Sequence, residues 1–290
     1  MLPLESVPNF SEGRDTATIE AIGTALESFA RVLDVHADED HNRSVFTLVG
    51  DEDGLVDALL AGVRVAVERI DLRRHEGVHP RIGVADVVPF VPIRPDDLER
   101  AGETAQRFAA LAAAELDLPV FLYAPPERGP AFYRHGGTEG LQGRLDSAEL
   151  VPDFGPTELH PTAGGVITGA RRPLIAFNVN LRGTVEAARS IAAVVRERGG
   201  GFPGVRALGL ELSRAGLAQV SMNVEDWEAS ALDEIVARIV EEAAARGAEV
   251  VGSELVGLMP AGAAAAAAGA ALRIDGFDAS RVLELRLLDG

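Results

Sequence analysis

The chain has 290 residues, of which 47% are hydrophobic and 25% charged, so it should form an ordinary globular protein with room for two domains. It contains no cysteine and no lysine, which excludes disulfides, thiolate metal sites and a lysine Schiff base. The formal net charge of −18 disfavours nucleic acid and anionic membranes as partners.

The first part of the chain alternates between strand-like and helix-like patterns in the order β-α-β-β-α-β. Asp15 is a suitable N-cap for the first helix, in which apolar residues up to Phe29 recur at helical spacing. The expected elements are a strand at 2–8, a helix over 19–29, strands at 31–38 and 44–50, a helix over 55–70, and a buried strand at 82–93. This order is the split unit of the ferredoxin-like fold.

The same order returns in the second half of the chain. Thr184 is a suitable N-cap for its first helix. The expected elements are a strand at 174–180, a helix over 185–195, strands at 205–212 and 217–223, a helix over 232–243, and a strand at 249–255. We therefore expect an α+β protein with two ferredoxin-like subdomains, residues 1–170 and 171–290, that face each other across a cleft or tunnel.

A helix over 95–116 and a strand at 119–123 lie between the two repeats. The following segment, 124–165, is rich in proline and glycine, and we expect it to be a long irregular loop with a functional role. The alanine-rich residues 261–271 should form a packed helix. Residues 282–288 fit an edge strand or a short terminal helix equally well.

The N-terminal residues M-L-P-L-E-S lack the basic and apolar regions of a signal peptide. No stretch of about 18 consistently apolar residues is present to span a bilayer. We therefore expect a cytoplasmic protein that does not bind membranes.

The polar run R-R-H-E-G-V-H-P-R, which precedes the strand at 82–93, concentrates chemically useful side chains. It places His75 and His79 among arginines. The string H-E-x-x-H matches a zinc motif, but Gly77 and Pro80 disfavour the helix that would bring both imidazoles to one face. A general acid/base role suits an imidazole in such a loop, because its ordinary pKa lies near neutrality. A solvated basic connector is the alternative.

Asparagines recur near the expected strand ends and could hydrogen-bond to a polar ligand there. They are Asn9, Asn178, Asn180 and Asn223. Turn formation would explain each of them as well. The polar connector D-H-N-R at 40–43, between two expected strands, is a further candidate for ligand contact.

Several motifs together resemble the formiminotransferase domain of glutamate formimidoyltransferases. They are V-P-N-F-S-E-G-R-D, D-E-D-H-N-R-S-V, R-H-E-G-V-H-P-R-I-G-V-A-D-V-V-P-F-V-P, P-D-F-G-P, L-I-A-F-N-V-N-L, A-Q-V-S-M-N and G-S-E-L-V-G-L-M-P. The resemblance implies two similar subdomains that line a tunnel. It also implies transfer of a formimidoyl group between N5 of tetrahydrofolate, a substrate, and the amino group of L-glutamate, with no metal.

The resemblance assigns candidate roles to individual residues. His79, the second histidine of H-x-G-x-H-P-R, corresponds to the family's catalytic histidine. The folate-contacting loop would comprise Gly155, Pro156, Thr157, Glu158, Leu159, His160, Pro161, Thr162, Ala163 and Gly164. Further candidates for substrate binding are Asn9, Asn42, Arg43, Arg81 and Asn178.

We further expect a homodimer, and a cyclodeaminase activity, if needed, on a separate enzyme. Two alternatives remain open: a non-catalytic folate-binding or regulatory protein on the same fold, and a relative that acts on 5-formyltetrahydrofolate. A metal-dependent hydrolase that uses the H-E-x-x-H string is a third and weaker alternative.

Overall fold

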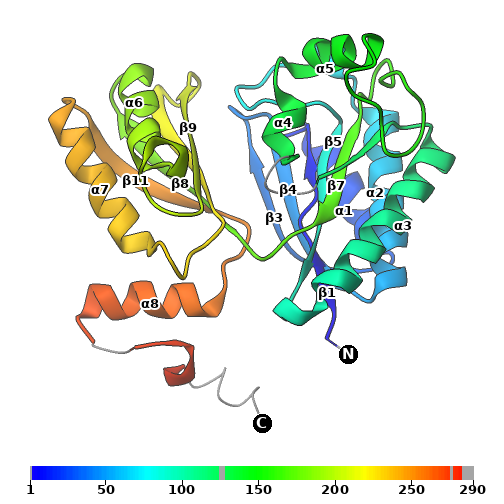
Figure 1. Ribbon diagram of the computed structural model, residues 1–290. Helices are drawn as coiled ribbons and strands as arrows, with labels where there is room; N and C mark the ends of the chain where they lie inside the picture. The colour runs from blue at the N-terminus through cyan, green and yellow to red at the C-terminus, as the bar shows by residue number, and fades with distance from the viewer. Residues whose placement is uncertain (1, 124–127, 275–276, 283–290) are drawn as a thin grey trace. The chain divides into compact units, whose positions relative to one another are not determined.

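The computed structural model describes residues 2–123, 128–274 and 277–282 (Figure 1). The chain forms two compact units, Met1–Arg172 and Pro173–Gly290. Within the described residues, no helix is both long enough and apolar enough to cross a lipid bilayer.

The first unit contains every element of the first expected repeat, followed by an extension. Its elements are β1 (Leu4–Ser6), β2 (Asn9–Phe10), α1 (Thr16–Glu27), β3 (Arg31–Asp38), β4 (Arg43–Gly50), α2 (Glu52–Arg69), β5 (Ala85–Pro92), α3 (Leu98–Leu116), β6 (Val120–Leu122), α4 (Pro130–Arg134), α5 (Gly137–Asp146) and β7 (Val166–Ala170), with short 3-10 helices at Leu72–Arg74 and Pro95–Asp97.

The first strand of this unit is interrupted. Both β1 and β2 pair antiparallel with β4 on one side and β5 on the other, so they act as one strand broken at Val7 and Pro8. The order β3-β4-β1/β2-β5 is that of a ferredoxin-like sheet. Beyond β5, the strands β7 and β6 continue the sheet in parallel. The strand β7 was not expected from the sequence.

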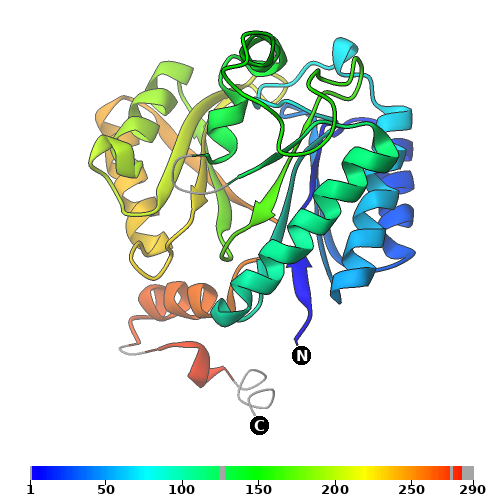
Figure 2. The same cartoon turned by 45° about the vertical axis from the view of Figure 1, so that its right-hand side comes forward.

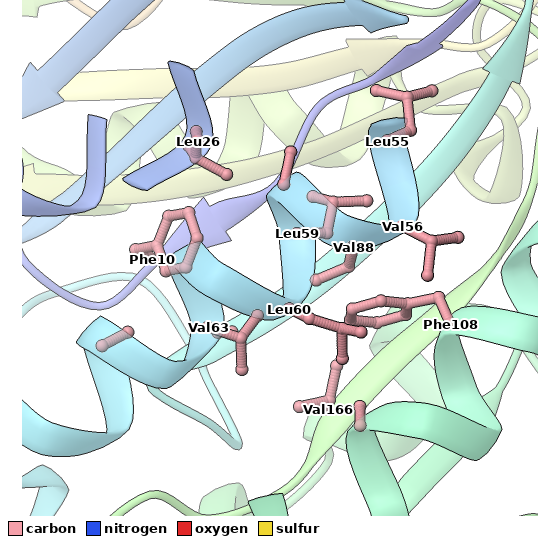
Figure 3. Packing of buried hydrophobic residues seen from close by; sticks show 14 of the residues in the cluster. Phe10, Leu26, Leu55, Val56, Leu59, Leu60, Val63, Val88, Phe108 and Val166 are labelled. Atoms are coloured by element: carbon pink, nitrogen blue, oxygen red, sulfur yellow. The ribbon is translucent and has the colours of Figure 1, made fainter. Parts of the chain in front are cut away.

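Helices α1, α2 and α3 cover one face of this sheet. Asp15 caps α1 as expected, with its carboxylate accepting from Ala17 N. Apolar side chains of these helices form one buried cluster with β2, β5 and β7 (Figure 3). Figure 2 shows α3 lying along the sheet, where it contacts β5 and β7. Phe29, expected on the buried helix face, is 55% exposed because α1 ends before it.

The opposite face of β5, β7 and β6 is covered by α4 and α5 (Figure 1). Tyr133, Leu141 and Leu145 from these helices pack against Phe121 and Ile167 of the sheet. The expectation that 124–165 is irregular throughout is therefore wrong. Its glycines separate short helices, since Gly136 has a φ of +77° between α4 and α5.

The second unit is a second ferredoxin-like fold. Its elements are β8 (Ile175–Arg182), α6 (Val185–Val195), β9 (Val205–Leu212), β10 (Leu217–Val224), α7 (Leu232–Ala245), β11 (Glu249–Val256) and α8 (Ala261–Leu272), with short 3-10 helices at Glu197–Gly199 and Ala279–Arg281. The sheet order β11-β8-β10-β9 is entirely antiparallel. Thr184 caps α6 through Ala187 N. The α+β fold with two such sheets is thus confirmed, while 283–288 lie outside the described residues.

Candidate active site

Three segments of the first unit meet beside one end of its sheet. They are the connector between β3 and β4, the loop at 75–84 that precedes β5, and the loop at 155–164 that precedes β7. The ring centroids of His41 and His79 lie 5.9 Å apart. Val84 N donates to Ala163 O at 2.9 Å, and Leu72 N donates to Thr162 O at 2.9 Å. The expected catalytic and folate-contacting segments are therefore neighbours.

Asn42 holds the connector in place. It has a left-handed φ of 47°, which asparagine tolerates better than most residues. Its Oδ1 accepts from Gly13 N at 2.9 Å, and its Nδ2 donates to Glu76 O at 3.0 Å. This buried amide thus joins the connector to the loop that carries His79.

Arg81 supports the backbone around both histidines. Its guanidinium donates to His79 O, at 2.5 Å from Nη2 and 3.1 Å from Nε, and to His41 O at 3.2 Å from Nη2. Nη1 contacts the ring of His75. Burial lowers the pKa of Arg81 to about 10, which still leaves it charged at neutral pH. Because these donors contact the protein itself, Arg81 fixes the loop.

His79 is half-buried, and its Nδ1 donates to Pro80 O at 2.8 Å. That bond selects the tautomer in which Nε2 carries the lone pair. Burial holds the pKa of His79 well below 6.5, and the charges of Arg43 and Arg134 and the neighbouring His41 lower it further. At neutral pH the ring is therefore a neutral proton acceptor.

His75 lies in a different environment. Its Nε2 is 2.9 Å from Asn42 O, and burial and the charge of Arg81 lower its pKa. Residues 75–80 form no helix, so the two imidazoles of the H-E-x-x-H string do not share a helix face. Within the described part of the chain, no group of three or more His, Cys, Asp or Glu side chains is arranged to hold a metal ion.

Arg43, the first residue of β4, is a half-buried cation. Its Nη2 donates to Oδ1 of Asn9, whose Nδ2 in turn donates to Val7 O at 2.7 Å. Burial and the charge of Arg134 lower the pKa of Arg43 to about 9. Its Nε is buried and has no acceptor among the described residues. Asn9 therefore orients this guanidinium group through a neutral amide.

Asp86 and Arg134 also belong to this site, although the sequence did not identify them. Asp86 Oδ1 accepts from Ile82 N at 2.7 Å, and Oδ2 accepts from Arg134 Nη2 at 2.5 Å. The two side chains are only 4% and 14% exposed. An aspartate inside the otherwise apolar run 82–93 was the available signal, because a buried carboxylate requires a partner.

The loop at 155–164 is joined to the His79 loop by a close backbone contact. Gly83 and Gly164 form an isolated β-bridge, and Gly165 N donates to Ile82 O at 2.9 Å. A Cβ on Gly164, whose φ is +72°, would lie 2.0 Å from Ile82 O. Only glycine fits here. His160 Nδ1 accepts from Ala163 N at 3.0 Å, which closes the turn.

Comparison with known proteins finds matches to both units of the chain. The family model for the formiminotransferase domain, N-terminal subdomain, matches residues 3–171, and that for the formiminotransferase domain matches 176–275. The chain belongs to the formiminotransferase domain family. A glutamate formimidoyltransferase of Streptococcus pyogenes serotype M1 is 40% identical over 294 residues, which cover 98% of each chain. Another, from Thermoplasma acidophilum, is 38% identical over 98% of this chain and 97% of its own.

Longer members of the formiminotransferase family carry a further part. The formimidoyltransferase-cyclodeaminase of Rattus norvegicus is 42% identical over 270 residues, which are 89% of this chain but 50% of that protein. The chain thus matches about half the length of this bifunctional relative. Among solved structures, a microcompartments protein of Desulfitobacterium hafniense aligns over 88% of this chain and 94% of its own, at 13% identity and a TM-score of 0.20, and nothing follows from so low a score.

Most of the candidate residues of this formiminotransferase-family chain lie together in the first unit. His79, Asn9, Arg43 and the loop at 155–164 surround the site, while Asn42 and Arg81 hold its backbone. Asn178 belongs to the second unit, on β8, where its Nδ2 donates to Glu254 Oε2 at 3.1 Å.

Proposed function

We propose that this chain transfers a formimidoyl group between N5 of tetrahydrofolate and the amino group of L-glutamate, and that His79 moves the proton. The observation that carries this proposal is the environment of His79: a neutral imidazole with its Nε2 lone pair available, near half-buried arginines suited to anionic substrates. Two relatives of nearly the same length, at 38% and 40% identity, are glutamate formimidoyltransferases, which supports the assignment.

The proposed chemistry begins with attack of a neutral amine on the formimidoyl carbon. The attacking nitrogen becomes cationic in the tetrahedral adduct, and His79 Nε2 takes a proton from it. The adduct then collapses by breaking the bond from carbon to N5. The imidazolium gives its proton to N5, so the leaving nitrogen departs neutral and His79 returns to its starting state. The low pKa makes this imidazolium a strong proton donor.

The loop from Gly155 to Gly164 is proposed to bind the folate. Its support is the direct backbone connection to the His79 loop through Gly83 and Gly164, which would keep N5 close to the imidazole. The anionic folate tail and the carboxylates of glutamate would pair with arginines near the site, since guanidinium groups bind carboxylates through paired hydrogen bonds.

The deciding experiment is a transfer assay with the purified wild-type chain. N-formimidoyl-L-glutamate and tetrahydrofolate should give 5-formimidoyltetrahydrofolate and glutamate, and the reverse reaction should also be measurable. Tight folate binding without transfer would favour the folate-binding alternative. Transfer from 5-formyltetrahydrofolate alone would favour the other alternative. The homodimer, the cytoplasmic location and the separate cyclodeaminase remain predictions.

A further inference from the structure

The sheet beside His79 contains a β-bulge at a buried carboxylate. In the pairing of β2 with β5, Asn9 lies opposite Val87 and Phe10 lies opposite Ala85, so Asp86 is the additional residue. Bulges of this kind reorient a side chain next to functional sites. Here Asp86 contacts Arg134, the last residue of α4. An arginine from outside the ferredoxin-like core is thereby fixed against the core strands.

One arginine is held on each side of β2. Strand β2 lies between β4 and β5, so Arg43 of β4 reaches Asn9 on one side while Asp86 of β5 holds Arg134 on the other. Both guanidiniums lie near enough to His79 for their charges to act on its ring. They form a pair of cations near the proton-accepting imidazole.

These cations are not fully neutralised by the protein. Arg43 donates to a neutral amide, and its charge and that of Arg134 repel each other. The Nε atoms of both residues are buried without an acceptor among the described residues. Buried charges and donors normally find partners. An anionic group of a ligand that contacts these guanidinium groups would supply the missing negative charge.

We infer that Arg43 and Arg134 bind the α-carboxylate of the amino-acid substrate, and that Asp86 is the positioning residue for Arg134. This inference rests on the proposed function, which puts the reacting amine within hydrogen-bond reach of His79 Nε2. In glutamate the amine and the α-carboxylate share one carbon atom, whereas the γ-carboxylate is separated from it by a flexible chain. Cations close to His79 are therefore better placed to meet the α-carboxylate than the γ-carboxylate.

If these arginines bind the α-carboxylate, its contribution to substrate specificity can be measured separately from that of the γ-carboxylate. Two analogues of glutamate distinguish the groups: 4-aminobutyrate lacks the α-carboxylate, and 2-aminobutyrate lacks the γ-carboxylate. Loss of a hydrogen bond to a charged group costs about 1.5–3 kcal/mol, or roughly 10–150-fold in kcat/KM. Arg134→Gln should therefore reduce the preference for glutamate over 4-aminobutyrate by about this factor. Its preference for glutamate over 2-aminobutyrate should change little.

The test measures kcat/KM with 5-formimidoyltetrahydrofolate and each of the three amines, together with direct calorimetric titration of glutamate and 4-aminobutyrate. Arg134→Gln leaves a buried carboxylate unpaired, which can unfold a protein. The double variant Asp86→Asn/Arg134→Gln removes both charges and avoids that problem. Arg64→Gln is the matched control, because Arg64 also pairs with a carboxylate, Glu115, but is 47% exposed on α2.

A lower preference for glutamate over 4-aminobutyrate in the folded double variant, with Arg64→Gln unchanged, supports the inference. An unchanged preference in that variant, in both kinetics and titration, overturns it even if the wild type is active. A wild type that binds glutamate more tightly than 4-aminobutyrate through Arg134 but transfers no formimidoyl group would support the carboxylate site and overturn the proposed function instead.

Discussion

His79 and His75 are four residues apart in the chain but differ in what their ring nitrogens contact. His79 uses Nδ1 on a carbonyl of its own loop, which leaves Nε2 for a substrate, whereas His75 contacts Asn42 O and Arg81. We expect His79→Ala to lower the transfer rate by about 10²–10⁴ while folate binding stays nearly constant, because the imidazole acts in the transition state. Steady-state kinetics and folate titration measure the two effects.

The control for this substitution is His135→Ala. Because His135 is exposed, its replacement should change neither the transfer rate nor folate binding. His75→Ala should mainly loosen the loop. If His79→Ala instead raised the folate dissociation constant strongly at unchanged turnover, the assignment of the proton transfer to His79 would be wrong. Restoration of activity in either variant by added zinc would favour the metal hypothesis.

The pKa of His79 gives a prediction for pH dependence. The neutral ring is the active form of a base, so activity is present above the pKa and lost as pH falls through it. Because burial and the charges of Arg43 and Arg134 hold this pKa well below 6.5, the acid limb of kcat/KM should lie well below pH 6.5. Arg134→Gln removes one cation and should move that limb to higher pH. A limb at or above pH 6.5 in the wild type would contradict the environment described for His79.

The sequence identified the residues with local signals and missed those that depend on distant partners. Gly77 and Pro80 correctly excluded a helix around His79. The structural uses of Asn42 and Arg81 were not predictable, because each donates to a backbone carbonyl in a distant segment, 34 and 40 residues away respectively. The Asp86–Arg134 pair joins residues 48 positions apart. No spacing rule within one element would reveal it.

Among the helices and strands, those with a clear local sequence pattern were predicted, and those without one were missed. Strands β3 and β9 have the predicted bounds. The short strand β7 was missed because its parallel pairing with β5 and β6 comes only from the tertiary fold. Helices α4 and α5 were missed because proline and glycine dominate their segment.

The contact between the loops at 75–84 and 155–164 can be tested by adding one methyl group to the second loop. Gly164→Ala would place a Cβ 2.0 Å from Ile82 O at a positive φ, so the loops must separate. We expect it to lower the free energy of unfolding by about 1–3 kcal/mol and to weaken folate binding. Gly143→Ala in α5 is the matched control, because its Cβ meets nothing within 4 Å and should be neutral or stabilising. Denaturant unfolding and folate titration check both variants. Equal behaviour of the two variants would show that the loops tolerate separation.

At the scale of the whole molecule, the repeated β-α-β-β-α-β order was the most reliable prediction. Each unit buries its own apolar cluster between its helices and its sheet, so the periodicity of each half already specifies a core. The parallel extension β7-β6 distinguishes the first unit from the second. That extension supports α4, and with it Arg134, which explains why the repeat alone did not reveal the full site.

The net charge of −18 repels an anionic substrate, whereas the arginines around His79 attract it. The screening length falls from about 10 Å at 0.1 M salt to about 3 Å at 1 M, so salt weakens whichever effect dominates. If the local cations dominate, as we expect, glutamate and folate should bind several-fold more weakly as salt rises. Tighter binding at high salt would mean that the overall negative field dominates. Titrations at increasing potassium chloride concentration, with sucrose as an uncharged control, measure whether binding weakens or tightens with salt. The dependence should be flatter in the Arg43→Gln variant than in Arg64→Gln, because only the former removes a positive charge at the site.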